Sequence, residues 1–561
     1  MSSRAVGKKV VWARRVVQAA CLCLFLFLFW AAGLGEDEEA SPWLRAFFDV
    51  DPLVLIATWL SAHELPAAFL FAFITLGATV LLGRVFCGWV CPLGTLHNMV
   101  SWLRTRRRRR RDAGDQWSPW QRAKYLLLVV LLVMALFGAH WIGVFDPLCL
   151  FYRSLATAVY PGAQYAVEDA ATAVYQSDPH LGPLHATALT EPAYGFLRDH
   201  VFARERGAFR GAGLIFALFV GIVVLNVYRP RFWCRYVCPL GALLGLCAKR
   251  PALRLVTEGC TECGRCAMKC PAAASPDKPG HWRSTECFGC WNCIAACDQD
   301  AITFKLKSPF PAPSEAKLDL SRRAVLSAGL GGVGGVILLR QSPEAQALIY
   351  NPELIRPPGA RPEREFLQRC LKCGLCMKAC PTNALHPTGL EAGLEGVWTP
   401  RLVPRVGYCA YNCNLCGQVC PTEAIEPLPL KEKQAIRIGL ATIDRARCLP
   451  YAYDRTCLIC EEHCPVSPKA IFFVTADVQT SDGRTRQLKQ PHVEPDRCTG
   501  CGICEHVCVF KDRPAIRVTS ANEARHSGNR AILPGPSQFE DADVEGAPES
   551  PYGQSDGNPY Q

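Results

Sequence analysis

The sequence predicts an α-helical membrane domain followed by small α+β modules. Half of the 561 residues are hydrophobic, and the first half of the chain contains four long apolar stretches. The chain also has 32 cysteines, most of them in short groups with regular spacing. A secreted disulfide scaffold is normally much shorter than this chain, so the cysteines favour metal sites. The length predicts several domains, and the composition divides them into a membrane part and soluble parts.

Four apolar stretches are long enough to cross a lipid bilayer as helices. They cover residues 16–34, 65–86, 125–145 and 211–227. Basic residues precede the first stretch, and the run Arg106–Arg111 follows the second, so the positive-inside rule places both in the cytoplasm. This position favours a membrane anchor over nucleic-acid binding for the arginine run. A cleaved signal peptide is the alternative for the first stretch, but no clear small-x-small site follows it. We expect residues 1–248 to form a four-span domain.

The membrane part contains an internal repeat. The sequences VDPLVL (50–55) and CGWVCPLG (87–94) are matched by FDPLCL (145–150) and CRYVCPLG (234–241). Two tandem hairpins related by an axis along the membrane normal would bring the D-P-L elements together outside and the C-x-x-x-C-P elements together inside. For Asp51 and Asp146, a helix N-cap followed by proline is favoured over a part in proton release.

Cys87 and Cys91, like Cys234 and Cys238, stand four residues apart, which places each pair on one helix face if the span continues through it. Small apolar helix ends are the structural alternative. Two copies of one motif at the same expected depth favour a shared redox or metal site, either thiol/disulfide or linked to a cluster. The isolated cysteines are expected to be packing residues, and the histidines that could bind an intramembrane haem are expected to be structural. These are Cys21, Cys23, Cys149, Cys247, His63, His97 and His140.

The segment 260–297 carries two runs of cysteine with the spacing of a two-cluster ferredoxin. In each run three cysteines follow at every third residue and a fourth comes four residues later, and in this arrangement the fourth cysteine ligates the other cluster. Structural zinc uses two paired C-x-x-C hooks and has no need for a third cysteine at the same step. Two 4Fe–4S clusters are therefore expected, held by Cys260, Cys263, Cys266 and Cys297, and by Cys287, Cys290, Cys293 and Cys270.

Residues 370–508 contain four further groups of four cysteines, which predict four more clusters and six in all. The ligands are Cys370, Cys373, Cys376, Cys380, Cys409, Cys413, Cys416, Cys420, Cys448, Cys457, Cys460, Cys464, Cys498, Cys501, Cys504 and Cys508. If neighbouring groups exchange their fourth cysteine, Cys420 joins the first group, Cys380 the second, Cys508 the third and Cys464 the fourth. Nesting of group one with four and two with three is an alternative that the spacing leaves open.

The segment between the two sets of clusters predicts a signal. A Pro-rich linker precedes Ser321-Arg322-Arg323, which is followed by a Gly-rich apolar stretch and by Ala345-x-Ala347, a pattern similar to a twin-arginine export signal. The glycines also fit G-x-G-x-x-G, but no βαβ unit surrounds them. We expect a two-cluster α+β ferredoxin-like domain at 250–305, the linker with this signal or a fifth span at 306–350, a four-cluster domain at 351–516, and a disordered tail at 517–561.

Residues 1–300 resemble the NapH-type quinol-dehydrogenase membrane component of periplasmic nitrate reduction, and residues 320–510 resemble its ferredoxin-type partner of the NapG/MauM type. The chain is similar to a fusion of the two. The resemblance implies a protein of the bacterial inner membrane that passes electrons from membrane quinol to a periplasmic reductase or cytochrome in anaerobic respiration, as an electron-transfer subunit rather than a stand-alone catalyst. Residues 250–318 would be cytoplasmic and 350–561 periplasmic. An electron-donating maturation factor for another metalloenzyme is the alternative.

Overall fold

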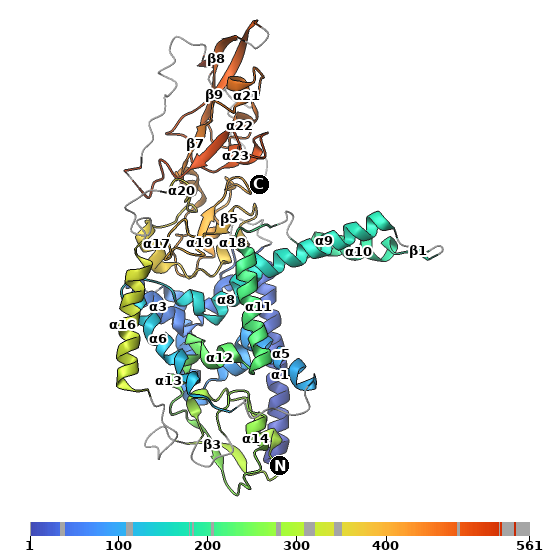
Figure 1. Cartoon of the computed structure of the whole chain (residues 1–561), viewed down its shortest axis with the longest axis vertical. Coiled ribbons are helices and arrows are strands. Elements are labelled where there is room, and N and C mark those ends of the chain that lie inside the picture. Colours follow the sequence, from blue (N-terminus) through green and yellow to red (C-terminus); the bar gives the residue numbers. More distant parts are fainter. Residues whose placement is uncertain are drawn as a thin grey trace, which may run out of the picture.

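The protein forms three parts that follow one another along its long axis (Figure 1). The computed structural model describes residues 2–33, 40–64, 66–107, 116–178, 180–181, 184–202, 207–275, 282–307, 320–341, 351–479, 483–526, 528–529 and 544–545. A helical domain (2–248, with the later helix α16) lies in the middle. The first cysteine unit (250–307) lies at its lower end beside the N-terminus, and the second cysteine unit (351–529) lies at its upper end.

The helical domain contains fewer full-length apolar helices than the four expected spans. By length and composition, three helical segments in the described residues could cross a membrane: Ser3–Ala31, Pro119–Leu136 and Arg322–Leu339. The apolar segments Pro52–Ala62, Ala67–Leu82 and Ala212–Tyr228 are shorter. Four spans are therefore not confirmed. In the chain order the main helices are α1 (Ser3–Ala31), α3 (Pro52–Ala62), α4 (Ala72–Leu82), α5 (Pro92–Arg107), α6 (Ala123–Leu136) and α11 (Ala212–Tyr228).

Two of the expected spans are shortened by local backbone geometry. Helix α4 ends at Leu82 because Gly83 adopts φ 82°, a left-handed value that does not continue an α-helix. Helix α6 ends at Leu136, and Gly138 has φ 79°. The short helix α7 (Ile142–Phe145) follows, so the expected span 125–145 is two helices rather than one.

The two D-P-L elements begin helices, as predicted. Asp51 caps α3 by accepting hydrogen bonds from the backbone N–H groups of Leu53 and Val54, and Pro52 is the first helical residue. Asp146 caps α8 (Pro147–Ser154) in the same way, through the N–H groups of Leu148 and Cys149. A proline at this position loses no hydrogen bond, because the first N–H groups of a helix have no intrahelical acceptor. The N-cap prediction is confirmed at both copies.

The C-x-x-x-C-P elements do not lie within continuous helices, which corrects the expectation that each pair shares one helix face. Cys87 lies in a single π-helical turn, Phe86–Val90, and Cys91 stands between this turn and α5. Cys234 lies in the short helix α12 (Phe232–Tyr236), and Cys238 is the N-cap residue of α13 (Pro239–Cys247). The proline after each second cysteine restricts that residue to an extended conformation, so a new helix starts there.

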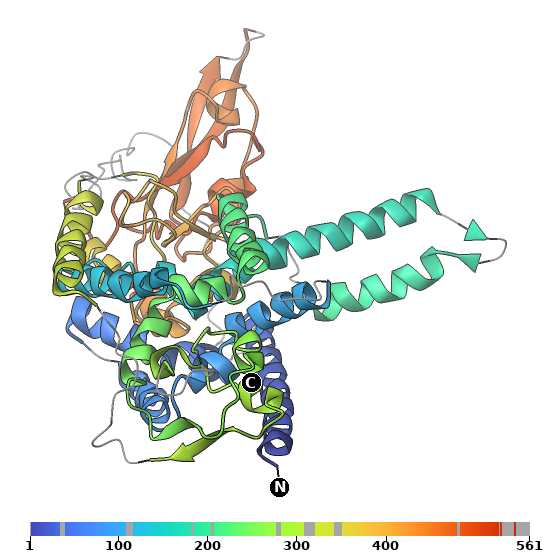
Figure 2. The same ribbon diagram turned by 60° about the horizontal axis from the view of Figure 1, so that its bottom comes forward.

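The segment between the third and fourth apolar stretches is largely helical. It forms an arm of two antiparallel helices, α9 (Tyr160–Ser177) and α10 (Thr187–His200), which projects away from the rest of the protein (Figure 2). The two-residue strands β1 (His180–Leu181) and β2 (Leu184–His185) pair near its tip.

The first cysteine unit is a small α+β module. Strands β3 (Leu253–Thr257) and β4 (Ile302–Leu306) form an antiparallel pair that joins the two ends of the unit. Between them lie the short helices α14 (Arg265–Met268) and α15 (Asn292–Ala296), which contact one another. Each helix follows a run of cysteines and contains the third cysteine of that run.

The twin-arginine pattern begins helix α16 (Arg322–Leu339), and the Ser321 hydroxyl caps it by accepting a hydrogen bond from the backbone N–H of Ala324 at 3.2 Å. The helix packs along α6. Its glycines permit a close approach, since a Cβ at Gly332 would lie 2.8 Å from the carbonyl oxygen of Val130. The G-x-G-x-x-G match therefore lies on a packed helix rather than on a loop. The Pro-rich linker (308–319) and Ala345-x-Ala347 lie outside the described residues.

The second cysteine unit is built from short helices and antiparallel strand pairs. Helix α21 (Leu449–Ala452) takes up the first four of the eight residues between Cys448 and Cys457. The helices are α17 (Glu363–Arg369), α18 (Leu375–Ala379), α19 (Leu415–Gln418), α20 (Leu430–Ala435), α21 (Leu449–Ala452), α22 (Ile459–Glu462) and α23 (Ile503–Val507). The pairs are β5 (Leu385–Pro387) with β6 (Pro400–Leu402), β7 (Leu440–Ile443) with β10 (Ile516–Thr519), and β8 (Ile471–Gln479) with β9 (Thr485–Val493) and β11 (Val544–Glu545).

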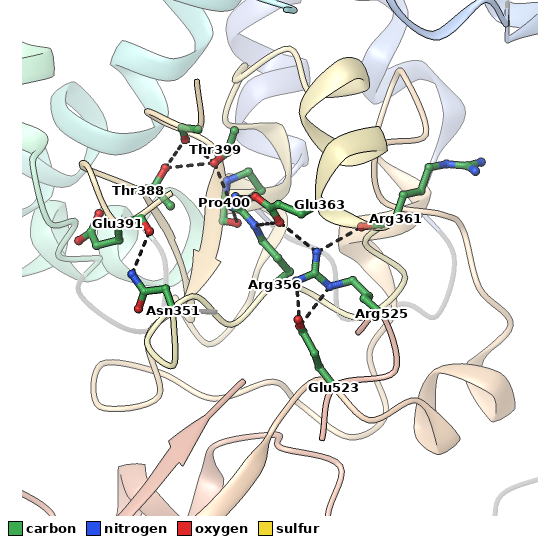
Figure 3. Close-up of polar contacts among 11 residues, drawn as sticks. Asn351, Arg356, Arg361, Glu363, Thr388, Glu391, Thr399, Pro400, Glu523 and Arg525 are labelled. Atoms are coloured by element: carbon green, nitrogen blue, oxygen red, sulfur yellow. Dashed lines mark hydrogen bonds and ion pairs between the residues drawn. The ribbon is translucent and has the colours of Figure 1, made fainter. Parts of the chain in front are cut away.

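The described structure of this unit continues beyond the expected boundary at residue 516. Arg525 donates to Glu363 at 3.1 Å and to Glu523 at 2.8 Å, and Arg356 also pairs with Glu363 (Figure 3). Burial alone would raise the pKa of Glu363, but the two guanidinium groups lower it to about 2. Residues up to 529 thus belong to the folded unit, because Arg525 supplies a charge that a buried carboxylate needs. Residues 530–543 and 546–561 of the expected tail lie outside the described residues.

Candidate metal centres

Four cysteines of the first cysteine unit line one cavity. They are Cys270, Cys287, Cys290 and Cys293, together with Trp282 and Phe288. The last three come from the second run, and Cys270 is the fourth cysteine of the first run, so the run exchange expected from the spacing is the arrangement found. We call this set the Cys287 cage. The other set is more open: Cys263 is exposed, and α14 with Cys266 contacts α15, which Cys297 directly follows.

A second cavity is lined by Cys370, Cys373, Cys376 and Cys420. We call this set the Cys370 cage. It combines three cysteines from the first group of the second unit with the fourth cysteine of the next group. Burial raises the pKa of the Cys370 thiol to about 11, while the nearby Lys372 ammonium opposes that rise. A cation close to the cage favours the thiolate form, which is the form that ligates iron.

The remaining twelve cysteines of the second unit form three sets by the electrostatic interactions between their thiols. Cys409 and Cys416 interact electrostatically with Cys413 and with Cys380. Cys448 interacts with Cys457 and Cys508. Cys504 interacts with Cys501 and Cys498 of its own group and with Cys460 and Cys464 of the preceding group. In each group a fourth cysteine of the neighbouring group takes part in these interactions, which favours neighbour exchange over the nested alternative.

These cages fit 4Fe–4S clusters by their donor set. Each brings four thiols together, and backbone N–H groups point at the sulfurs: Lys372 N–H donates to Cys370 Sγ, and Ala274 N–H donates to Cys270 Sγ, both at 3.4 Å. Such hydrogen bonds stabilise the negative charge on ligating sulfur and tune the potential of a cluster. The four thiolates that hold a 4Fe–4S cluster lie farther apart than the ligands of a single metal ion. In the described residues no three His, Cys, Asp or Glu side chains converge closely enough for a single ion.

The Cys287 cage is attached to the helical domain through a buried ion cluster. Glu286, the residue before Cys287, pairs with Lys124 and lies 3.4 Å from Arg84, and the Tyr125 hydroxyl donates to it at 3.0 Å. Phe288, two residues after Glu286, lies against the backbone of the helical domain. A Cβ at Gly88 would collide with the carbonyl oxygen of Phe288. A glycine is therefore needed at position 88 for this loop to approach.

The Cys370 cage is attached to the opposite end of the domain in a similar way. A Cβ at Gly143 would collide with the carbonyl oxygen of Leu371, the residue after Cys370. The Lys372 ammonium donates to the carbonyl oxygen of His140 at 2.9 Å, and Arg153 donates to the carbonyl oxygen of Lys372 at 2.7 Å. Each cage thus presents the loop between its first two cysteines to a glycine of the helical domain.

The four cysteines of the C-x-x-x-C-P elements are brought together at the end that carries the first cysteine unit. The thiol of Cys238 interacts electrostatically with Cys234, Cys87 and Cys91, and all four are buried. The second cysteine of each motif accepts a backbone hydrogen bond: Gly94 N–H donates to Cys91 Sγ at 3.4 Å, and Gly241 N–H donates to Cys238 Sγ at 3.2 Å. The two copies therefore form one cluster of thiols with matching geometry.

Two arginines beside these thiols were missed by the sequence reasoning. Arg231 donates to the carbonyl oxygen of Cys87 at 2.8 Å, and a guanidinium nitrogen of Arg84 lies 2.6 Å from where a Cβ of Gly241 would be. Each arginine thus reaches from its own repeat into the other one. Their guanidinium carbons lie 5.1 Å and 4.5 Å from the ring centroid of Phe288. The sequence does contain a signal for these arginines, because the repeated motif can be extended to R-x-x-C-x-x-x-C-P-L-G in both copies.

The cysteines, histidines and aspartates that were expected to be structural differ in their burial and in their neighbours. Cys149 is fully buried and interacts electrostatically with Asp146 and with Cys373 of the Cys370 cage, so it lies close to a metal centre. His97 and His140 are also fully buried, whereas His63 ends α3 in a left-handed conformation. Asp51 and Asp146 come together, with their carboxyl groups in contact.

Three sequence models of iron–sulfur families match four segments of the chain. A 4Fe–4S binding domain matches residues 64–111 and again 212–255, which contain the C-x-x-x-C-P element of each copy of the internal repeat. A 4Fe–4S dicluster domain matches residues 252–298, and a further 4Fe–4S binding domain matches residues 367–386. No solved structure matches the chain.

Each of three curated relatives matches less than half of the chain. It is 36% identical to the methylamine utilization ferredoxin-type protein MauM of Methylorubrum extorquens over 211 residues, 36% of this chain and 89% of MauM. It is 34% identical to the ferredoxin-type protein NapG of Escherichia coli over 214 residues, 38% of this chain and 89% of NapG. The protein named "Putative electron transport protein YccM" of Escherichia coli is 26% identical over 255 residues, 44% of this chain and 58% of YccM.

The cages, the cluster-binding families and these relatives define an iron–sulfur electron-transfer protein. Within that class, the chain belongs to the NapG and MauM family of ferredoxin-type proteins through the region that matches them.

Proposed function

We propose that the chain carries electrons from membrane quinol towards a periplasmic reductase or cytochrome, with a NapH-type N-terminal part fused to a NapG/MauM-type C-terminal part. The observation that carries this proposal is the attachment of a cysteine cage to each end of one apolar helical domain. A chain of redox centres that begins at one end of such a domain and continues at the other suits transfer across a bilayer.

The 24 cysteines in six groups of four are the proposed ligands of six 4Fe–4S clusters. When bound, such clusters accept and release single electrons. The protein supplies the rest: thiolates in fixed positions, backbone N–H groups directed at sulfur, and lysines or arginines that compensate negative charge. The four buried thiols of Cys87, Cys91, Cys234 and Cys238 are proposed as an additional redox site, with Arg84 and Arg231 as positioning residues.

The proposed location is the bacterial inner membrane, with the first cysteine unit in the cytoplasm and the second in the periplasm. Helix α16 separates the two units in sequence and is apolar enough to cross a membrane. Its Arg322–Arg323 start is the proposed twin-arginine signal, which would export the second unit after folding. The arm formed by α9 and α10 lies at the same end as the second unit and is the proposed contact for a periplasmic partner.

The test is reduction of the purified protein by a quinol. Protein isolated without oxygen is expected to contain about 24 iron and 24 sulfide per chain if all six cages are filled. In liposomes, a menaquinol analogue should bleach the visible absorption of the clusters. Filled clusters that no quinol reduces, but that a soluble reductant does, would refute the quinol route and leave the electron-transfer class intact.

The assignment of cages has its own test. Cys420→Ser should remove the cluster of the Cys370 cage, and Cys380→Ser should remove the cluster that contains Cys409. The electron paramagnetic resonance signals of the two variants must therefore differ from each other. Loss of the same signal in both would contradict neighbour exchange.

A further inference from the structure

Asp51 and Asp146 form a buried pair of carboxyl groups between the two sequence repeats. Neither residue is exposed to solvent. In each, Oδ1 accepts the capping hydrogen bonds from the following helix, whereas Oδ2 has no hydrogen-bond donor among the described residues. The two carboxyl groups contact one another. Only a proton on one of them turns this contact into a hydrogen bond.

A pair of this kind is stable with one proton. Two ionised carboxylates in contact inside an apolar domain would repel each other without solvent to screen them, so both cannot carry charge. One shared proton gives each Oδ2 a partner and leaves a single negative charge. The N-cap role uses only the other oxygen of each carboxyl, so capping does not account for the pairing.

The pair lies beside the Cys370 cage. Cys149 on α8 interacts electrostatically with both carboxyls and also with Cys373 of that cage. Arg153, one helical turn further along α8, interacts with Asp146, Cys149, Cys373 and Cys370. Tyr152 of α8 also interacts with Cys373 and with Cys376 of the cage. The negative charge of the pair and the charge of the cage are therefore coupled through a buried thiol and a buried guanidinium.

We propose that Asp51 and Asp146 share one proton in the oxidised protein and that the pair binds a second proton when an electron enters the Cys370 cage. One electron and one proton then arrive together, and the local charge is unchanged. The electron comes from a reductant, a hydroquinone in the proposed function, and the proton from the same donor or from solvent. The inference rests on a cluster in this cage but not on quinol as its source of electrons.

The experiment measures the midpoint potential of this cluster against pH in the full chain, with a soluble reductant as titrant. The signal of the cluster is identified by its loss in Cys376→Ser. In the unmodified protein the potential should fall by up to about 59 mV per pH unit, the conversion of a tenfold change for one electron and one proton. In Asp51→Asn and in Asp146→Asn it should not change with pH. Asparagine is as good an N-cap as aspartate, so both variants keep their helices.

Asp49→Asn is the matched control. Asp49 is a buried carboxyl two residues from Asp51 and pairs with Arg45 at 3.6 Å. This variant should keep the slope of the unmodified protein. A flat profile in the unmodified protein, or the same slope in both Asp51→Asn and Asp146→Asn, would overturn the proposal. If Cys376→Ser removes no signal, the cage assignment fails and the proposal fails with it. If the midpoint potential changes with pH but the protein oxidises no quinol, only the proposed electron donor is refuted.

Discussion

The attachment of the first cysteine unit to the helical domain depends on one buried carboxylate, that of Glu286. Removing this carboxylate is the sharpest test of the contact between the two parts. Glu286 is 3% exposed and faces Lys124 and Arg84, whose side chains are both fully buried. The change Glu286→Gln keeps the size of the side chain and removes its charge. It leaves two buried cations without a carboxylate, which is far more costly than the loss of the pair itself.

The expected magnitude follows from the burial. Breaking a buried ion pair by removing one partner costs about 3–5 kcal/mol, and for a unit as small as this one each 1 kcal/mol lowers the melting temperature by roughly 4–8 °C. Glu258 in the same unit provides the control, because it pairs with Lys305 at 3.0 Å but is 71% exposed. Exposed pairs contribute about 0–1 kcal/mol.

The assay is the thermal loss of cluster absorption in the full chain, followed for both variants and for the unmodified protein. Glu286→Gln should lower the transition temperature of the first unit by roughly 12 °C or more, and Glu258→Gln by roughly 8 °C at most. The double variant Glu286→Gln with Lys124→Gln should recover part of the loss, since one of the two uncompensated cations is gone. Equal effects of Glu286→Gln and Glu258→Gln would refute the reasoning.

Three further outcomes are expected. The pKa of Glu363, lowered to about 2 by two arginines despite its burial, lies below the ordinary value near 4.5. The ionised carboxylate therefore contributes about 3 kcal/mol to the free energy of unfolding, fully above that ordinary value, and the contribution is lost as the pH falls towards 2. In Glu363→Gln the free energy of unfolding of the second unit, measured with denaturant, should depend less on pH over this range. Gly143→Ala should weaken docking of the second unit by about 1–3 kcal/mol and raise its protease sensitivity, whereas Gly213→Ala, where a Cβ meets nothing within 4 Å, should not. Protease added to spheroplasts should cleave the second unit and spare the first, and Arg322→Lys with Arg323→Lys should abolish that cleavage; a protected second unit in the unmodified protein would show that α16 does not cross.

The features that were predicted from sequence are those set by a few neighbouring residues. A D-P pair determines a helix start by itself, because the carboxylate and the missing N–H act within one turn. A run such as Cys370 to Cys376 determines a thiol loop for the same reason. The choice between exchange and nesting needed the structure, because it depends on which distant cysteine, Cys420 or Cys508, closes the cage.

The features that were not predicted depend on contacts between distant segments or on single backbone angles. Gly83 ends a helix that hydropathy alone extends to residue 86, because hydropathy carries no information on a positive φ. Arg525 falls in a polar stretch whose composition predicts disorder, yet one buried carboxylate, Glu363, holds it in place. Arg84 and Arg231 were overlooked because each acts on the other repeat, so neither has a partner nearby in sequence.

The repeated sequence motifs of the helical domain mark the two ends where the cysteine units dock, rather than the helices between them. Between D-P-L and C-x-x-x-C-P the two copies share little beyond apolar character, which is all that a helix needs to pack in a bundle or against lipid. At the ends of the bundle the requirement is specific. One end joins two carboxyls beside the Cys370 cage, and the other joins four thiols and two arginines beside Phe288 of the Cys287 cage. A duplicated hairpin gives each end two copies of one motif, and each end uses both copies to build a single charged site next to a metal centre.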